Sequence, residues 1–250
     1  MKKILVLLAL ACCFGVTASA NSLLDSLEYD MRLGYCIGGT APVNMPATIR
    51  SLNDYSFQRN FSLGVDARKQ LSRRWGVMAG LRIENKGMHI DADVKNYNMA
   101  IVRGGERLEG HFTGCNNTKV EEWMLTVPVM ATFMPCNNLI LRCGPYASLL
   151  TSREFSGYAY DGYLRVDDPT GPKVELGCDE GTRGTYDFSE DMRRMQYGII
   201  IGADWYMNKH LGLYADISWG LTGIFNSRFN TIEQTLYPIY GTIGLTYRIR

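Results

Sequence analysis

The sequence of 250 residues predicts an all-β fold, namely a closed, antiparallel barrel of eight up-and-down strands. Three observations support this prediction. Apolar and polar residues alternate with a period of two in eight segments, which is the spacing of strands that have one apolar face. The connections between the segments are alternately short and long, as in a series of hairpins. An even number of such strands can close on itself, so that no sheet edge stays unpaired.

The first twenty residues have the features of a signal peptide. Lys2 and Lys3 form a basic start, an apolar stretch follows, and residues 18–20 are the small residues of a cleavage site. The apolar stretch is too short to span a bilayer. We therefore expect residues 1–20 to be a cleaved signal peptide and residues 21–250 to be a single barrel domain.

The charge balance argues against nucleic acid as a partner. Loss of the two leader lysines takes the 26 basic residues to 24, against 25 acidic ones, so the mature chain is close to neutral. It has no basic run or stripe of the kind that binds nucleic acid. No later segment reaches the roughly 18 uninterrupted apolar residues of a membrane-spanning helix.

The cysteines leave their pairing open. Five remain after the leader, which is an odd number for an exported chain. They are Cys36, Cys115, Cys136, Cys143 and Cys178. Cys115 and Cys178 lie in polar stretches and could pair, and the alternative is five free thiols. Lipid attachment at Cys12 is the alternative to cleavage after Ala20, but residues 9–11, which precede Cys12, fit that alternative poorly. No CxxC motif and no Cys/His pair stands at metal-binding spacing, so we expect no metal and no cofactor.

Each strand of the barrel is expected where the alternation is unbroken. The expected strands cover residues 29–38, 61–68, 75–84, 122–133, 139–149, 196–207, 211–220 and 237–249. Short polar joints follow the second, fourth and sixth strands. Long polar segments, residues 40–56, 90–118, 152–192 and 222–236, form the other connections. Short periplasmic turns and long outer loops are typical of outer-membrane barrels.

The two faces of the strands favour a membrane barrel over a water-soluble one. The polar face is rich in glycine and carries a few charges of both signs, which suits a crowded interior. Aromatic residues on the apolar face gather at both strand ends, as at the two membrane interfaces. The short-turn end has Trp75, Phe133, Trp205 and Tyr247, and the long-loop end has Phe57, Trp123, Trp219 and Tyr237. The alternative is a secreted barrel of the lipocalin kind, whose apolar face surrounds a ligand.

Charged residues on the polar face are expected to fill the lumen. Asp204 and Asp216 stand in two otherwise apolar segments that a short turn joins, and alternation places both on the inner face. An unpaired buried charge is costly, so we expect basic partners. The predicted lumen charge cluster is Asp66, Arg68, Arg82, Glu84, Lys86, Arg142, Arg194, Asp204 and Asp216. We interpret it as a structural plug, and a proton or ion relay is the alternative.

Six segments carry a resemblance to a known family. They are GYCIGGTAPVNMP (34–46), GLRIENKGM (80–88), VKNYNM (94–99), GPYASLL (144–150), FSGYAYDGYLR (155–165) and YPIYGTIGLTYR (237–248). In this order they resemble the PorT-like outer-membrane β-barrel proteins of Bacteroidetes, known as the outer membrane protein beta-barrel domain, over about residues 28–250. The resemblance implies an integral outer-membrane barrel, and some relatives take part in protein secretion. This chain ends in Arg250, where a terminal aromatic residue is common.

The segment 152–192 is the most suggestive candidate for a binding surface. It holds tyrosines beside charged residues, a combination that suits sugar rings or protein contacts. The predicted surface is Tyr158, Tyr160, Asp161, Tyr163 and Arg165. The alternative is a loop that folds over the barrel mouth, with its tyrosines packed on one another.

A catalytic site has only weak support. His89 stands in HIDAD with Asp91 and Asp93 at spacings of two, so a His–Asp pair at the rim could act as a general base. The alternative is a set of polar residues at the end of a strand. There is no GxSxG motif, no glycine-rich phosphate loop and no metal signature.

We therefore expect a small, non-catalytic, integral outer-membrane barrel that acts in surface binding or envelope assembly. The expected partners are outer-membrane lipid, together with envelope or secretion proteins or surface glycans. One alternative function is a component of outer-membrane transport or protein secretion. The other is a hydrolase or acyltransferase with its site at the rim.

Overall fold

A computed structural model describes residues 27–42, 47–58, 60–229, 231–232 and 234–249. The expected signal peptide, residues 1–20, and the expected mature start at Asn21 lie outside these residues. The elements are β1 (Leu27–Pro42), β2 (Ile49–Phe57), β3 (Phe61–Gln70), β4 (Trp75–Arg103), β5 (Glu106–Cys136), β6 (Leu139–Val166), β7 (Lys173–Leu176), β8 (Gly184–Asp187), the 3-10 helix η1 (Ser189–Asp191), β9 (Met195–Tyr206), β10 (Leu211–Gly220) and β11 (Leu236–Arg248). Within the described ranges, no helix has the length and apolar character needed to cross a membrane.

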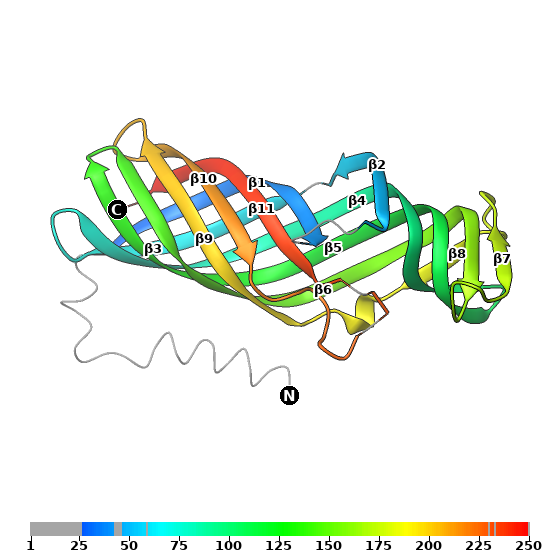
Figure 1. Ribbon diagram of the computed structural model, residues 1–250. Helices are drawn as coiled ribbons and strands as arrows, with labels where there is room; N and C mark the ends of the chain where they lie inside the picture. The colour runs from blue at the N-terminus through cyan, green and yellow to red at the C-terminus, as the bar shows by residue number, and fades with distance from the viewer. Residues whose placement is uncertain (1–26, 43–46, 59, 230, 233, 250) are drawn as a thin grey trace.

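Eight of these strands pair side by side in a ring. The antiparallel order is β1, β3, β4, β5, β6, β9, β10 and β11, and β11 pairs again with β1. The ring occupies the left half of Figure 1. Each of the eight expected strands corresponds to one strand of this ring. Short polar turns close three of the hairpins, and in one of them Asn208 Oδ1 accepts hydrogen bonds from the backbone N–H groups of His210 (2.9 Å) and Leu211 (2.7 Å).

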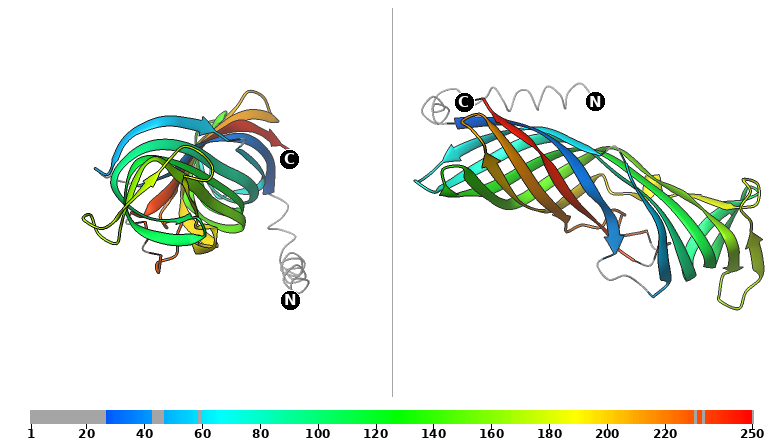
Figure 2. Two further views of the ribbon diagram at one scale, coloured as in Figure 1. Left: turned by 90° about the vertical axis from the view of Figure 1, so that its right-hand side faces the viewer. Right: turned by 90° about the horizontal axis from the view of Figure 1, so that it is seen from above.

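Three strands continue far beyond the ring, which corrects the loop prediction. β4, β5 and β6 have 29, 31 and 28 residues, so the expected loops at 90–118 and 152–192 are largely strand. The described part of the expected loop at 40–56 is also mostly strand, because β1 ends at Pro42 and β2 begins at Ile49. We call residues 88–103, 106–121 and 152–166, together with β2, β7 and β8, the outer extension. It forms the curved right half of Figure 1. β8 pairs with β6 and also, at Val102 and Thr185, with β4, so the end of the extension curls round (Figure 2).

The polarity of the strand faces reverses where the outer extension begins. In the ring part of β4, Leu81 is exposed on the outer face and Arg82 is buried on the inner face. Farther along the same strand, Met88 and Ala92 are buried on the inner face, the same face as Arg82. Asp91 lies on the outer face, the same face as Leu81. β5 shows the same reversal on the two sides of Trp123. The ring therefore has a polar interior, whereas the outer extension has an apolar one.

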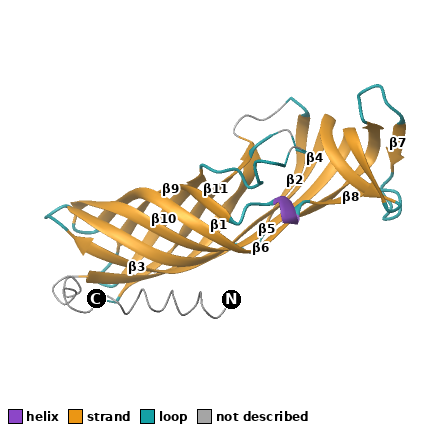
Figure 3. Ribbon diagram, turned by 90° about the horizontal axis from the view of Figure 1, so that it is seen from below, coloured by secondary structure: helices purple, strands orange, loops and turns teal. Residues whose placement is uncertain are grey.

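The apolar interior of the extension is its hydrophobic core. Phe112, Val120, Phe155 and Leu164 are among its buried residues. The segment around η1 lies against the base of this core, next to the mouth of the ring, as Figure 3 shows in purple. Ile224, Phe225 and Ile232, from the stretch that follows β10, pack into the same core. Burial of one face of each long strand in this core stabilises the continuation of the three strands as a sheet.

The outer face of the ring matches the expected aromatic pattern. The four tryptophans, Trp75, Trp123, Trp205 and Trp219, are all exposed there, between 37% and 56%. The side chain of Phe57 lies outside the described part of the structure. The five described cysteines are free, so the Cys115–Cys178 pair that the sequence left open is not formed.

Candidate functional site

Six charged side chains close a ring of ion pairs across the lumen. In order they are Arg32, Asp66, Arg82, Asp216, Arg142 and Asp204, and Asp204 returns to Arg32. The N–O distances are 2.8 Å for Arg32–Asp204, 3.3 Å for Arg82–Asp66, 3.0 Å for Arg82–Asp216, and 2.7 Å from Arg142 to both Asp204 and Asp216. Arg32 Nε also pairs with Asp66. We call these six residues the charge ring.

The charge ring is electrically neutral and buried. Each arginine contacts two aspartates and each aspartate two arginines, and no side chain of the six is more than 3% exposed. Burying an ion pair costs desolvation energy, which is repaid only when geometry and partners are good. The six residues come from β1, β3, β4, β6, β9 and β10, so the pairing links six of the eight strands of the ring across the lumen.

Glycines on the inner face provide the space for the charge ring. A Cβ atom on Gly80 would lie 1.8 Å from Asp66 Oδ1, and one on Gly202 would lie 1.8 Å from Asp216 Oδ1. The ring of Tyr214 lies 5.0 Å from the guanidinium carbon of Arg32 and 5.9 Å from that of Arg142, within the range of cation–π contacts. At this level the lumen is filled by side chains.

Three other predicted members of the lumen charge cluster pair above and below the charge ring. Toward the outer end, Lys86 Nζ lies 3.0 Å from Glu84 Oε2, and Thr126 Oγ1 donates to the same oxygen at 2.6 Å. Toward the turn end, Arg68 pairs with Glu28. These layers place charged groups along the lumen on both sides of the charge ring.

Two residues differ from the prediction. Arg194 is exposed and not part of the cluster, because the chain bends there just before β9 and its carbonyl accepts a hydrogen bond from the Leu150 N–H (2.8 Å). Arg32 was missing from the predicted cluster, although it belongs to the charge ring. The alternation of the first strand already put Arg32 on the inner face with Asp30, and that signal could have found it.

The predicted tyrosine surface lies on a strand and not in a loop. Tyr158, Tyr160, Asp161, Tyr163 and Arg165 belong to the extended part of β6. Tyr158 and Tyr160 stand on either side of the buried Ala159, so they lie on the outer face of the extension. We call the five residues the tyrosine face.

Cations and carboxylates hold the tyrosine face in place. The rings of Tyr158 and Tyr160 are 5.5 Å apart, and the guanidinium of Arg183 lies 4.3 Å from the Tyr158 ring. Lys173 Nζ lies 4.6 Å from the Tyr163 ring. The Tyr160 hydroxyl donates to Asp91 Oδ2 at 2.8 Å, which connects β6 to β4 over the intervening strand.

A hydrogen-bonded polar network continues across the neighbouring strands. Asp93 accepts hydrogen bonds from Ser51 Oγ (2.9 Å), Asn53 Nδ2 (2.9 Å) and Cys115 Sγ (3.2 Å). The hydrogen bonds from Asn53, Cys115 and Ser51 lower the pKa of Asp93. Burial and the hydrogen bond to Asp93 raise the pKa of the Cys115 thiol to about 11. At neutral pH the carboxylate is therefore charged and the thiol is protonated.

His89 lies in this network but bonds to an amide. Its Nε2 lies 2.8 Å from Asn117 Oδ1, and Asn117 Nδ2 in turn donates to Asp91 Oδ2 at 3.1 Å. The side chain of Asn117 thus stands between the imidazole and the carboxylate that the sequence had suggested as a pair. Among the described residues, no group of three or more His, Cys, Asp or Glu side chains is arranged to hold a metal ion.

Comparison with known proteins defines the family. A family model described as "Outer membrane protein beta-barrel domain" matches residues 18–226, which is most of the chain. The chain belongs to the outer membrane protein beta-barrel domain family. It is therefore an outer-membrane barrel, and the apolar outer face of its strand ring meets membrane lipid.

Solved structures of outer-membrane proteins show a limited likeness to this barrel. The attachment invasion locus protein Ail of Yersinia pestis has 10% sequence identity, with 89% of this chain and 98% of that chain covered and a TM-score of 0.38. Ail in complex with the heparin analogue sucrose octasulfate has 9% identity, coverage of 90% and 99%, and a TM-score of 0.40. OprG of Pseudomonas aeruginosa has 14% identity, coverage of 89% and 96%, and a TM-score of 0.36. Comparison with curated proteins finds no match.

Proposed function

We propose that this barrel is a non-catalytic membrane anchor with a filled lumen, and that its outer extension carries a binding surface for envelope partners. The observation that carries the proposal is the charge ring. Eight strands leave an interior that side chains can just fill. Here six buried charged groups occupy it with their charges neutralised. A barrel of this kind serves best as a support for what lies outside it.

The outer extension is suited to binding because strands hold its surface in place. The tyrosine face combines aromatic rings with charged groups, and such surfaces contact sugars and proteins well. Surface glycans and envelope proteins are therefore the proposed ligands. A role in transport or secretion would have to act through such partners, since the charge ring fills the lumen.

The organisation of the chain in the envelope is part of the proposal. The motifs of the sequence support a PorT-like member of the Bacteroidetes barrels, with residues 1–20 removed after export and residues 21–250 forming the mature domain. The eight-stranded ring would close the barrel in the membrane. Its short turns would face the periplasm, and the outer extension would face outward. We assign no catalytic role, because the described partner of His89 is the Asn117 amide.

A glycan array tests the proposed surface. The purified protein is compared with a Tyr160→Ala/Tyr163→Ala variant and with an Arg107→Ala/Glu109→Ala control, whose pair is more than half exposed on the same extension. We expect the affinity of the tyrosine variant for the bound glycans to be at least about tenfold lower than that of the parent protein. The control variant should bind them with unchanged affinity. Equal binding by all three proteins would contradict the proposed surface.

A further inference from the structure

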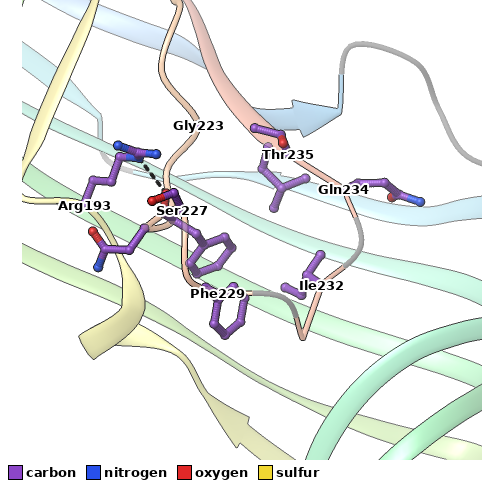
Figure 4. A pocket seen from close by; sticks show the side chains of 10 residues that line it. Arg193, Gly223, Ser227, Phe229, Ile232, Gln234 and Thr235 are labelled. Atoms are coloured by element: carbon purple, nitrogen blue, oxygen red, sulfur yellow. Dashed lines mark hydrogen bonds between the residues drawn. The ribbon is translucent and has the colours of Figure 1, made fainter.

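A cavity opens at the outer mouth of the barrel, away from the tyrosine face. It has a volume of about 530 Å³ and lies between Arg193, just before β9, and described residues of the stretches 223–229 and 232–236 other than residue 233 (Figure 4). This volume is in the range of sites that bind small molecules. Among the residues that line it are Arg193, Phe225, Asn226, Phe229 and Gln234.

The cavity lies at the level where the outer lipid headgroups are expected. The carbonyl of Arg194, the neighbour of Arg193, accepts a hydrogen bond from the N–H of Leu150. Ser152, two residues after Leu150 in β6, pairs with Trp123 of β5. Trp123 belongs to the outer aromatic belt and stands where the face polarity of β5 reverses. Aromatic belts stand at the membrane–water interface. A ligand in the cavity could therefore reach it from the lipid surface or from water.

Arg193 gives the described lining of the cavity a positive charge. Of the described residues that line it, Arg193 alone has a charged side chain. Arg193 Nε donates to the Phe225 carbonyl at 2.6 Å, and the Arg193 N–H donates to the Ile224 carbonyl at 2.7 Å, so both ends of the residue are fixed. Within the described part of the chain, its two terminal nitrogens form no hydrogen bond or ion pair. A held guanidinium with two free nitrogens suits a phosphate or a carboxylate.

The remaining lining suits a sugar ring. Phe225 and Phe229 stack with their ring centroids 4.5 Å apart and form an apolar wall. The amide of Asn226 and the hydroxyls of Ser227 and Thr235 belong to residues of the same lining. Aromatic faces next to hydrogen-bonding groups match the apolar faces and hydroxyl edges of a saccharide.

We propose that the Arg193 cavity binds a phosphorylated sugar, whose phosphate pairs with Arg193 and whose ring packs against the phenylalanine wall. A soluble sugar phosphate and the headgroup of a phosphorylated glycolipid share this chemistry. The site goes beyond the proposed function, because it is separate from the tyrosine face and is tested by different variants.

Calorimetry on the full-length mature protein in phosphatidylcholine nanodiscs tests the site. Glucose 1-phosphate should bind saturably and at least about tenfold more tightly than glucose or inorganic phosphate, because only it uses both halves of the cavity. Arg193→Gln should weaken this binding about tenfold or more, and Arg193→Lys should keep part of it. Arg107→Gln removes the same charge at an exposed position of the extension and should change nothing.

A second variant separates loss of the site from loss of the fold. Ser227→Trp fills the cavity, leaves Arg193 intact and should also abolish binding, and heat-modifiable gel mobility reports whether each variant is folded.

Nanodiscs that contain a phosphorylated glycolipid distinguish the source of the ligand. Blocked binding of glucose 1-phosphate there identifies the lipid headgroup, and an unchanged isotherm identifies the soluble sugar. The proposal is overturned by no saturable binding at about 10 mM, by equal binding of glucose or inorganic phosphate, or by binding that Arg193→Gln leaves unchanged.

Discussion

Replacement of Gly202 by alanine tests how tightly the charge ring is packed. Gly202 on β9 lies opposite Asp216 on β10. A Cβ atom on Gly202 would lie 1.8 Å from Asp216 Oδ1 and 2.8 Å from the Ala215 carbonyl oxygen. The carboxylate cannot yield freely, because it pairs with Arg142 at 2.7 Å and with Arg82 at 3.0 Å. A single methyl group must therefore displace part of the charge ring.

The expected cost follows from two limits. Overpacking a well-filled interior costs typically about 1–3 kcal/mol. Breaking a buried ion pair costs about 3–5 kcal/mol, because a charge is left without its partner. Since Asp216 can keep part of its contacts, we expect Gly202→Ala to lower the free energy of unfolding by about 2–4 kcal/mol.

Gly241→Ala is the matched control for this experiment. On β11, a Cβ atom on Gly241 would have its nearest neighbours at 3.7 and 4.0 Å, so the same chemical change should stay within about 0.5 kcal/mol of the parent protein. Urea unfolding in lipid vesicles, followed by heat-modifiable gel mobility, measures both variants. Equal stability of the two would refute the packing argument. Alternation alone predicts that Gly202→Ser is mild, whereas the structure predicts that it is harmful.

Three further outcomes are expected. Arg32→Gln should lower the free energy of unfolding in the same assay by about 3–5 kcal/mol, because two aspartates lose a partner. A loss below about 1 kcal/mol would contradict a closed charge ring. Ile201→Lys should cost about 2–4 kcal/mol in lipid, since Ile201 is 59% exposed on the outer face; an effect independent of lipid would contradict this placement. Asp93→Asn should lower the pKa of the Cys115 thiol from about 11 and so speed its alkylation at pH 8, measured against the exposed Cys178 as internal reference. An unchanged alkylation rate would show that Asp93 does not control the pKa of the thiol.

The strand ring could be predicted because its alternation is simple. Along the eight segments, a period of two sends apolar residues outward and polar residues inward, so Asp204 and Asp216 were placed correctly. Their specific partners could not be derived, because pairing depends on which strands face each other across the lumen and at what height. Arg32 shows this most clearly, since the alternation put it inside but gave no reason to join it to Asp66 and Asp204.

The outer extension was missed because the polarity of the alternation changes there. Met88, Ile90, Ala92 and Val94 continue the period of two, but now the apolar residues are on the inner face. Without an apolar outer face the segment looked like a polar loop. The tyrosine face was recognised by its composition, and the strand that holds it was not. Arg194 was placed wrongly because the alternation was continued past the bend that precedes β9.

Single-channel recording in planar bilayers tests whether the charge ring occludes the lumen. Purified protein should insert without stable, large-conductance openings, because the charge ring and the layers above and below it occupy the lumen. The wild-type recording is compared with that of a folded Arg32→Ala/Arg82→Ala/Asp204→Ala variant, which lacks three of the six charge-ring side chains. Stable large-conductance openings from the wild-type protein would show that the lumen is open.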